Sequence, residues 1–217
     1  MNLGEIVLEV ENIVQDDTFD SGRITDYVNN TIKYIADRVN LPGLKGIDTV
    51  ETELSQNYTS LTGLTDGFSG RLVACLTEDI IIYPTLELLM AEYIGALDEA
   101  GDVEGIALEG NTLWYQKIPA AAETLTFVYY QSPTVMTETA HTPPADIPES
   151  VHRSLFVNGT AFLIYDQIED AVEDKKVNAK SHFWQAFDTT NSTSGMSQLM
   201  AILARKKVHY ISSVWNY

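Results

Sequence analysis

The sequence contains little cysteine, and its histidines are scattered. Cys75 is the single cysteine among 217 residues, so no disulfide can form within one chain. It lies in the apolar run 72–76, where a buried, unreactive thiol is expected. The four histidines form no HxxxH or HExxH pattern, so a zinc site is not expected. One of them, His152, falls in the first turn of an expected helix and is expected at the surface.

Basic residues are also scarce. The chain has 13 Lys and Arg against 31 Asp and Glu, which gives a net charge of −18 and a pI near 4.3. Binding a nucleic-acid duplex requires clustered Lys and Arg, so specific nucleic-acid binding is not expected. The acidic surface has two interpretations. It keeps the protein soluble, or it lines a passage through which DNA slides without sticking.

Long apolar runs and targeting segments are absent from the sequence. No stretch approaches the roughly 18 apolar residues that a membrane helix needs. Residues 1–5 lack the basic and apolar regions of a signal peptide. The sequence therefore predicts no membrane contact and synthesis in a cytoplasm.

Familiar catalytic patterns are missing as well. The chain has no G-x-S-x-G elbow for a serine nucleophile. The glycines of 63–70 are not followed by Lys-Ser or Lys-Thr, so they predict a hairpin loop rather than a phosphate cradle. Adjacent carboxylates such as Asp16 and Asp17 are typical of solvated loops in so acidic a chain. We expect a protein that is not an enzyme, with no catalytic residues, no metal and no cofactor.

Hydrophobic periodicity predicts two helices at each end of the chain. Apolar residues recur at helical spacing over 3–14 and again over 24–39, where Asp20 or Ser21 can cap the second helix. Near the other end, Pro148 favours the first turn of a third helix that reaches about residue 167 or beyond. A fourth helix is expected from about 170 to 187. The two pairs should pack as one antiparallel bundle.

The central region changes to the short period of β-strands. The fold class expected is α+β: a helical bundle built from both ends of the chain (1–44 and 148–187), an inserted small β-sandwich or barrel (46–132), a Pro-rich crossing (133–147), and a linker with an extended C-terminal tail (188–217). A short capped helix is expected at 85–93. Seven strand candidates lie at 49–54, 58–61, 72–76, 80–83, 103–108, 112–118 and 124–130.

The C-terminal tail reverses the charge of everything before it. The last 20 residues carry three basic and no acidic side chains, so +3 follows the −21 of residues 1–197. Residues 189–195 are polar and small, and predict a flexible tether with nothing to bury. The tail therefore favours binding to another molecule, although docking on its own acidic body is the alternative. The candidate partner-binding residues are Leu199, Ile202, Leu203, Arg205, Lys206, Lys207, Tyr210, Ile211, Trp215 and Tyr217.

Seven segments of the chain follow one another in a distinctive order. They are NLGEI at 2–6, ITDYVN at 24–29, IKYIADR at 32–38, GNTLWY at 110–115, IP at 118–119, LTFVYYQSP at 125–133 and IPESVH at 147–152. This order resembles the head-to-tail adaptor (neck connector) proteins of tailed bacteriophages. The resemblance covers roughly residues 2–187. It has two departures: Thr31, where the family often has Ala, and the insert 66–70.

The resemblance implies a structural protein of the virion neck. It implies a homo-oligomeric ring, typically of twelve copies, that sits beneath the portal protein and holds the next neck or tail protein. We expect this ring to surround a channel for DNA. Because of the charge and the apolar side chains of the tail, we expect the tail segment to bind the portal. A second hypothesis is a carbohydrate-binding accessory or tail protein that uses Trp114, Tyr115, Tyr129 and Tyr130. A third, an acidic-site hydrolase, has no motif to support it.

Overall fold

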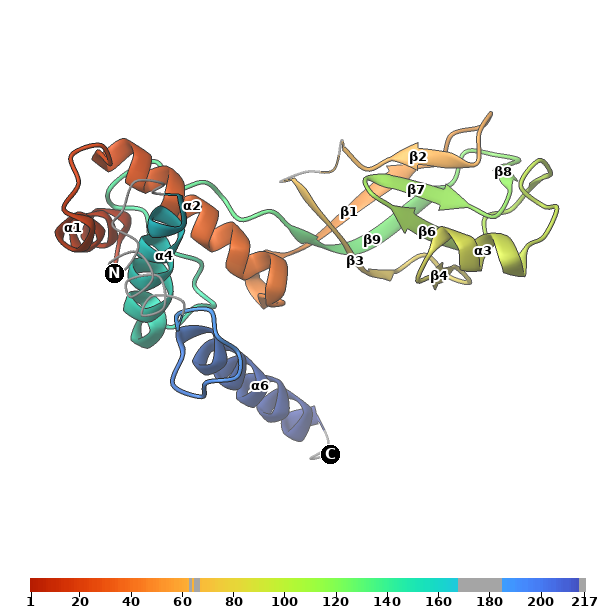
Figure 1. Ribbon diagram of the computed structural model, residues 1–217. Coiled ribbons are helices and arrows are strands. Elements are labelled where there is room, and N and C mark those ends of the chain that lie inside the picture. Colours follow the sequence, from red (N-terminus) through yellow and green to blue (C-terminus); the bar gives the residue numbers. More distant parts are fainter. Residues whose placement is uncertain (63, 65–66, 168–184, 215–217) are drawn as a thin grey trace. The chain divides into compact units, whose positions relative to one another are not determined.

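The chain folds into two compact units. The computed structural model describes residues 1–62, 64, 67–167 and 185–214 (Figure 1). One unit, here the helical unit, comprises Met1–Gly43 and Pro133–Tyr217. The other, here the β unit, is Leu44–Ser132. In sequence, the β unit is therefore inserted into the helical unit.

The helical unit begins with the two helices that the periodicity predicts. Helix α1 spans Leu3–Val14, and its start is closed by a capping box between Asn2 and Glu5. Helix α2 spans Ser21–Arg38, with Asp20 accepting a hydrogen bond from the Arg23 amide at 2.8 Å. The predicted apolar stripes are buried on both helices, and the helices contact each other. Burial of these stripes stabilises the pair far more than helix propensity does.

The Pro-rich segment after the β unit packs on these helices. Leu3 N–H donates to the His141 carbonyl at 2.7 Å, and Gly4 N–H donates to the Thr139 carbonyl at 3.0 Å. Asn29 and Met136 exchange two hydrogen bonds of 2.9 Å between the Asn29 amide group and the Met136 backbone. Residues 133–147 therefore belong to the helical unit although they form neither helix nor strand.

The third helix is less regular than the sequence predicts. Pro148 is followed by a 3₁₀ turn, η2 (Glu149–Val151), a π-helical segment, η3 (Arg153–Val157), and then helix α4 (Asn158–Gln167). The π-helical segment buries three consecutive side chains, those of 155–157. The fourth predicted helix, 170–187, lies mostly outside the described residues. The C-terminal helix is α6 (Gly195–Val214).

The prediction that His152 lies at the surface is wrong. Its side chain is 4% exposed, and its ring packs edge-on against Phe156, with 5.3 Å between ring centroids. Imidazole Nε2 lies 2.8 Å from the Ile147 carbonyl oxygen. Other parts of the helical unit cover His152. Its position in the first turn after Pro148 therefore does not expose it to solvent.

The described strands of the β unit form three open sheets. Each of the seven predicted strand runs overlaps an observed strand, and the predicted short helix is α3 (Leu86–Glu92), capped by Thr85. The sheet orders are β1-β9-β3, β2-β7-β6-β4 and β5-β8. The strands are β1 (Lys45–Glu51), β2 (Tyr58–Ser60), β3 (Phe68–Cys75), β4 (Ile81–Tyr83), β5 (Ala100–Gly101), β6 (Gly105–Glu109), β7 (Thr112–Tyr115), β8 (Ile118–Pro119) and β9 (Thr124–Gln131).

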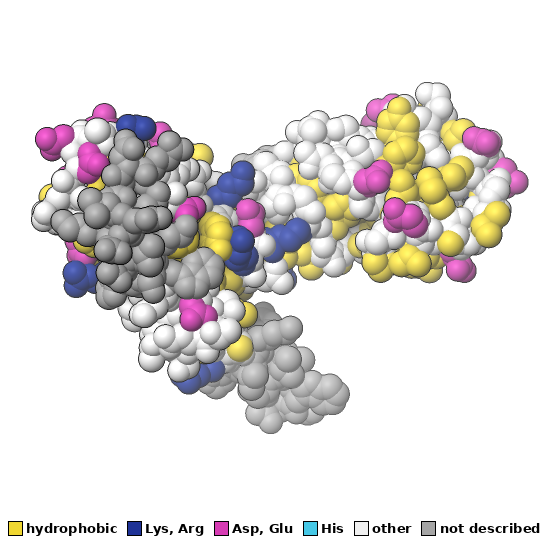
Figure 2. Space-filling model, in the orientation of Figure 1, with side chains coloured by type: hydrophobic (Ala, Val, Ile, Leu, Met, Phe, Trp, Pro, Cys, Tyr) yellow, Lys and Arg dark blue, Asp and Glu magenta, His cyan; other side chains and the backbone are white. Residues whose placement is uncertain are grey.

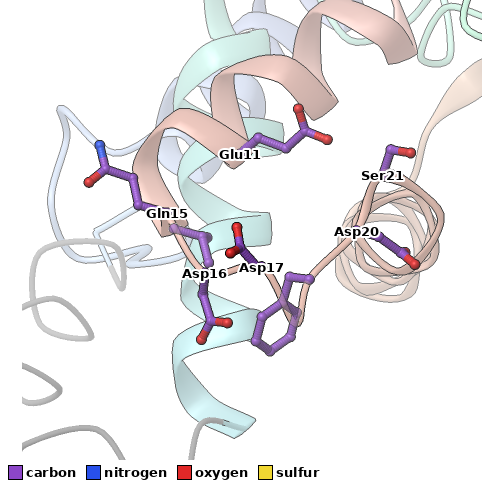
Figure 3. A pocket seen from close by; sticks show the side chains of 8 residues that line it. Glu11, Gln15, Asp16, Asp17, Asp20 and Ser21 are labelled. Atoms are coloured by element: carbon purple, nitrogen blue, oxygen red, sulfur yellow. The ribbon is translucent and has the colours of Figure 1, made fainter.

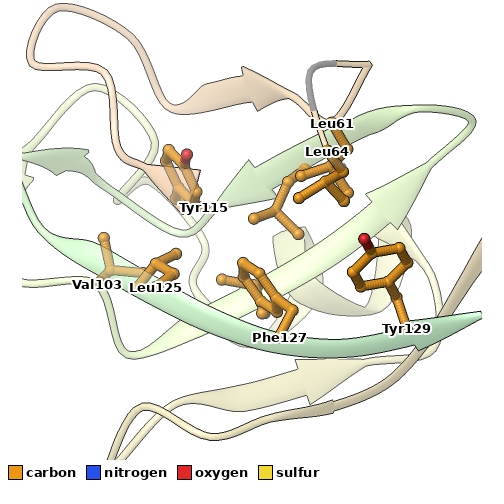
Figure 4. Packing of buried hydrophobic residues seen from close by; sticks show 9 residues of the cluster. Leu61, Leu64, Val103, Tyr115, Leu125, Phe127 and Tyr129 are labelled. Atoms are coloured by element: carbon orange, nitrogen blue, oxygen red, sulfur yellow. The ribbon is translucent and has the colours of Figure 1, made fainter. Parts of the chain in front are cut away.

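One hydrophobic core joins the two larger sheets of the β unit (Figure 4). Strand β9 contributes Leu125, Phe127 and Tyr129, at alternate positions, from the three-stranded sheet. Strands β6 and β7 contribute Ile106, Leu113 and Tyr115 from the four-stranded sheet. Cys75 is half-buried beside this core. Among the described strands no sheet closes on itself, so the prediction of a barrel is wrong. The two larger sheets remain open and share one hydrophobic core.

Candidate partner-binding surface

The base of the C-terminal helix is anchored in the helical unit. Helix α6 contacts η2 and η3, and its residues Met196 and Leu199 are 1% and 0% exposed. A Cβ atom at Gly195 would lie 2.7 Å from Ser154 Oγ and 2.8 Å from Leu155 Cγ, so only glycine permits this close approach. The first turns of the predicted tail are therefore part of the fold.

The segment before α6 differs from the flexible tether that the sequence predicts. Asp188 Oδ1 accepts hydrogen bonds from both the amide and the hydroxyl of Thr190, at 2.8 and 2.6 Å. Asn191 Oδ1 holds Thr193 in the same way, at 3.0 and 2.7 Å. Ser194 is 3% exposed, and its hydroxyl accepts from the amide of Ser197 at 3.1 Å. The polar residues thus build two turns and a helix start.

The outer half of α6 carries the basic residues of the tail. Met200 is 46% exposed, Ile202 and Leu203 are half-buried, and Arg205 is exposed. Of the ten predicted site residues, Leu199 faces the chain's own body, and only three more have described side chains. For four more, the structure describes the helical backbone of α6 but not the side chains: Lys206, Lys207, Tyr210 and Ile211. The last two, Trp215 and Tyr217, lie outside the described residues.

A pocket of about 430 Å³ lies beside the connection between α1 and α2 (Figure 3). Four carboxylates line it, but two of them have clear structural roles. Asp16 Oδ1 accepts hydrogen bonds from the hydroxyl and the amide of Thr18, which lower the pKa of Asp16. Asp20 caps α2. The lining is Glu11, Val14, Gln15, Asp16, Asp17, Phe19, Asp20 and Ser21, which offers no histidine or cysteine for acid–base or nucleophilic chemistry.

The aromatic residues considered for glycan binding do not form one exposed surface. Tyr115, Tyr129 and Tyr130 are 0%, 1% and 8% exposed. Burial raises the pKa of Tyr115 far above its ordinary value. Only Trp114 stays partly accessible, packed against Tyr58 with ring centroids 5.1 Å apart. Three of the four predicted residues therefore serve the core or its edge.

The described part of the chain has neither a metal-binding cluster nor a membrane-spanning helix. No group of three or more His, Cys, Asp or Glu residues there could hold a metal ion. No helix within the described ranges is both long and apolar enough to cross a membrane.

Comparison with known proteins identifies the family. The family described as SU10 adaptor protein matches residues 1–206, which include both units and the base of α6. The comparison with curated proteins gives no match. Because the family match spans nearly the whole sequence, the chain belongs to the SU10 adaptor protein family, a family of structural phage head-to-tail adaptors.

Proposed function

We propose that this protein forms a ring, typically of twelve copies, between the portal and the next neck or tail protein of the virion. The ring surrounds the channel through which DNA passes. The protein is made in the host bacterial cytoplasm and joins the particle during assembly. The observation that carries this proposal is the family match over residues 1–206, which covers both units of the chain.

The charge distribution supports a passive role toward DNA. Residues 1–197 carry a net charge of −21, so DNA inside the ring meets a surface of its own sign and is not retained. A protein that had to grip DNA would need clustered Lys and Arg. The carboxylates are thus compatible with passage through the channel.

The C-terminal segment is the proposed portal-binding element. Its first turns are fixed by Met196 and Leu199, so the basic residues that follow start from a defined place on the helical unit. The portal-facing residues would be Ile202, Leu203, Arg205, Lys206, Lys207, Tyr210, Ile211, Trp215 and Tyr217. Apolar and aromatic anchors of this kind commonly contribute about 2 kcal/mol or more each to an interface. Ordering of this segment on the portal would offset part of that gain.

Truncation tests the proposal. A chain that ends at Arg205 keeps Leu199 and the anchored base of α6. We expect it to melt within about 1 °C of the full chain, because the buried residues Met196 and Leu199 are retained. Mixed with the portal protein of the same phage, it should no longer form the complex that the full chain forms in native mass spectra and negative-stain images.

A charge-reversal pair gives a milder version of this test. A double variant, Lys206→Glu with Lys207→Glu, should bind the portal more weakly, and its binding should depend less on salt concentration. Lys33→Glu, an exposed change on α2, is the matched control. If the truncated chain still joined the portal, the role of the segment would be wrong. If the full chain formed no complex with the portal and no ring, the adaptor role itself would be wrong.

A further inference from the structure

The four-stranded sheet of the β unit has an apolar face that points away from the core. Tyr58 on β2 is paired with Trp114 on β7. Trp114 is paired with Ala107 on β6, and Ala107 with Tyr83 on β4. Residues paired directly across neighbouring strands project to the same side of a sheet. Leu113 and Tyr115 face the core, so this row of four residues lies on the opposite face.

Helix α3 is held tightly on this same face. Leu89 is fully buried, and a Cβ atom at Gly105 would lie 3.0 Å from Leu89 Cδ1. The rings of Tyr83 and Tyr93 pack edge to face, with 6.0 Å between centroids. Thr85 fixes the start of the helix by accepting from the Leu88 amide. The helix and the sheet thus present their outward side chains from a rigid support.

Large apolar side chains remain exposed around this support. Figure 2 shows hydrophobic side chains gathered over the end of the β unit that carries α3. We define the outer patch as Tyr58, Ile81, Leu88 and Ile94, which are 39%, 56%, 51% and 86% exposed. Ile81 is paired with Gly105, so it lies on the same face as α3. Gathered apolar exposure of this kind marks a surface that binds a partner.

The charge around the outer patch selects the partner. Residues 72–116 contain nine Asp and Glu and no Lys, Arg or His. Glu87 and Glu92 lie on α3 itself. Nucleic acid and anionic lipid headgroups would be repelled by such a surface. The rings of Tyr58 and Trp114 are tilted by 47° to each other, so they form no flat platform for a sugar ring. A protein segment that is both cationic and apolar fits both properties.

We infer that the outer patch docks a segment of a different virion protein in which Lys or Arg side chains flank apolar ones. Apolar side chains of that segment cover Leu88 and Ile94, and its cations meet the carboxylates of α3. The inference rests on the proposed function, because that function assigns the chain's own basic segment, 198–217, to the portal. The occupant of the patch is then another protein of the neck or tail.

Photo-crosslinking in assembled virions tests the occupant. A photoreactive residue replaces Ile94 in the full chain, and the same residue at Ile47, 67% exposed on β1, is the control site. We expect the Ile94 probe to form an adduct with one other virion protein. Mass spectrometry should map it to a segment with an excess of Lys and Arg. Leu88→Glu should lower the adduct yield about tenfold, as loss of an interface anchor does, whereas Ile47→Glu should leave it within about twofold.

Three outcomes would overturn the inference. These are an adduct with another copy of this chain, including its residues 198–217, an adduct with lipid or glycan, and no adduct in particles that contain the protein in the neck. Because Leu88 is half exposed, its substitution leaves the core of the β unit intact, and a circular dichroism spectrum checks this. Absence of the protein from the neck would instead count against the proposed function.

Discussion

Burial of Leu199 anchors the start of the C-terminal helix in the helical unit. The side chain is 0% exposed, in the second turn of α6. Leu199→Ala removes buried methyl groups and leaves a cavity, which commonly costs about 2–5 kcal/mol. Helix α6 packs on two short segments, η2 and η3, and we expect the lower part of that range, about 2–3 kcal/mol.

Thermal unfolding followed by circular dichroism at 222 nm measures this loss, because helices dominate the signal and belong mainly to the helical unit. For a unit of this size, 1 kcal/mol shifts the midpoint by about 4 °C. Leu199→Ala should therefore lower the helical transition by about 8–12 °C. Met200→Ala, the adjacent position at 46% exposure, should shift it by no more than about 2 °C.

Equal shifts for the two variants would refute the reasoning, because they would mean that Leu199 contributes no more burial than an exposed neighbour. Hydrogen exchange gives an independent check. The amides of 196–199 should exchange more slowly than those of 206–214 in the unmodified chain. They should lose that protection in Leu199→Ala.

The two units and the charge of the chain support four further predictions. The excised β unit, 44–132, should give a dispersed NMR spectrum because its core is its own; a collapsed spectrum would contradict this. Gly159→Ala should lower the helical midpoint by an amount equivalent to about 1–3 kcal/mol, because the added Cβ would lie 2.6 Å from Phe187 Cζ. Burial raises the pKa of Tyr115, so the β unit should lose stability as pH rises above about 10, the ordinary tyrosine pKa; Tyr115→Phe should reduce that loss in pH-dependent melts. Duplex DNA should show no gel shift with micromolar protein at physiological salt.

Local patterns in the sequence were sufficient to predict most of the elements. The apolar period of α2 and its cap Asp20, and the Thr85 cap of α3, are properties of a few consecutive residues. The pairing of β1 with β9 and the parallel pairing of β4 with β6 are not, because they depend on contacts between distant segments. Burial of His152 depends in the same way on which element covers it.

The loop at 188–195 and the outer patch were both missed in the sequence, for different reasons. The turns before α6 repeat an Asp/Asn-x-Thr pattern that also occurs at Asp16 and Thr18, so a compact loop at 188–195 could have been predicted. The outer patch was missed because its residues come from separate elements. The absence of basic residues from 72–116 was the available signal.

The pairing of β1 with β9 has a consequence for the stability of the helical unit. Lys45 is paired with Tyr130, so the folded β unit holds its own two ends side by side. The two parts of the helical unit are then joined as if by a short loop. If the β unit unfolds, the same parts are joined by a flexible chain of about 90 residues, and closing that longer loop costs about 3 kcal/mol more in entropy. A core substitution in the β unit should therefore lower the melting temperature of the helices through chain connectivity alone.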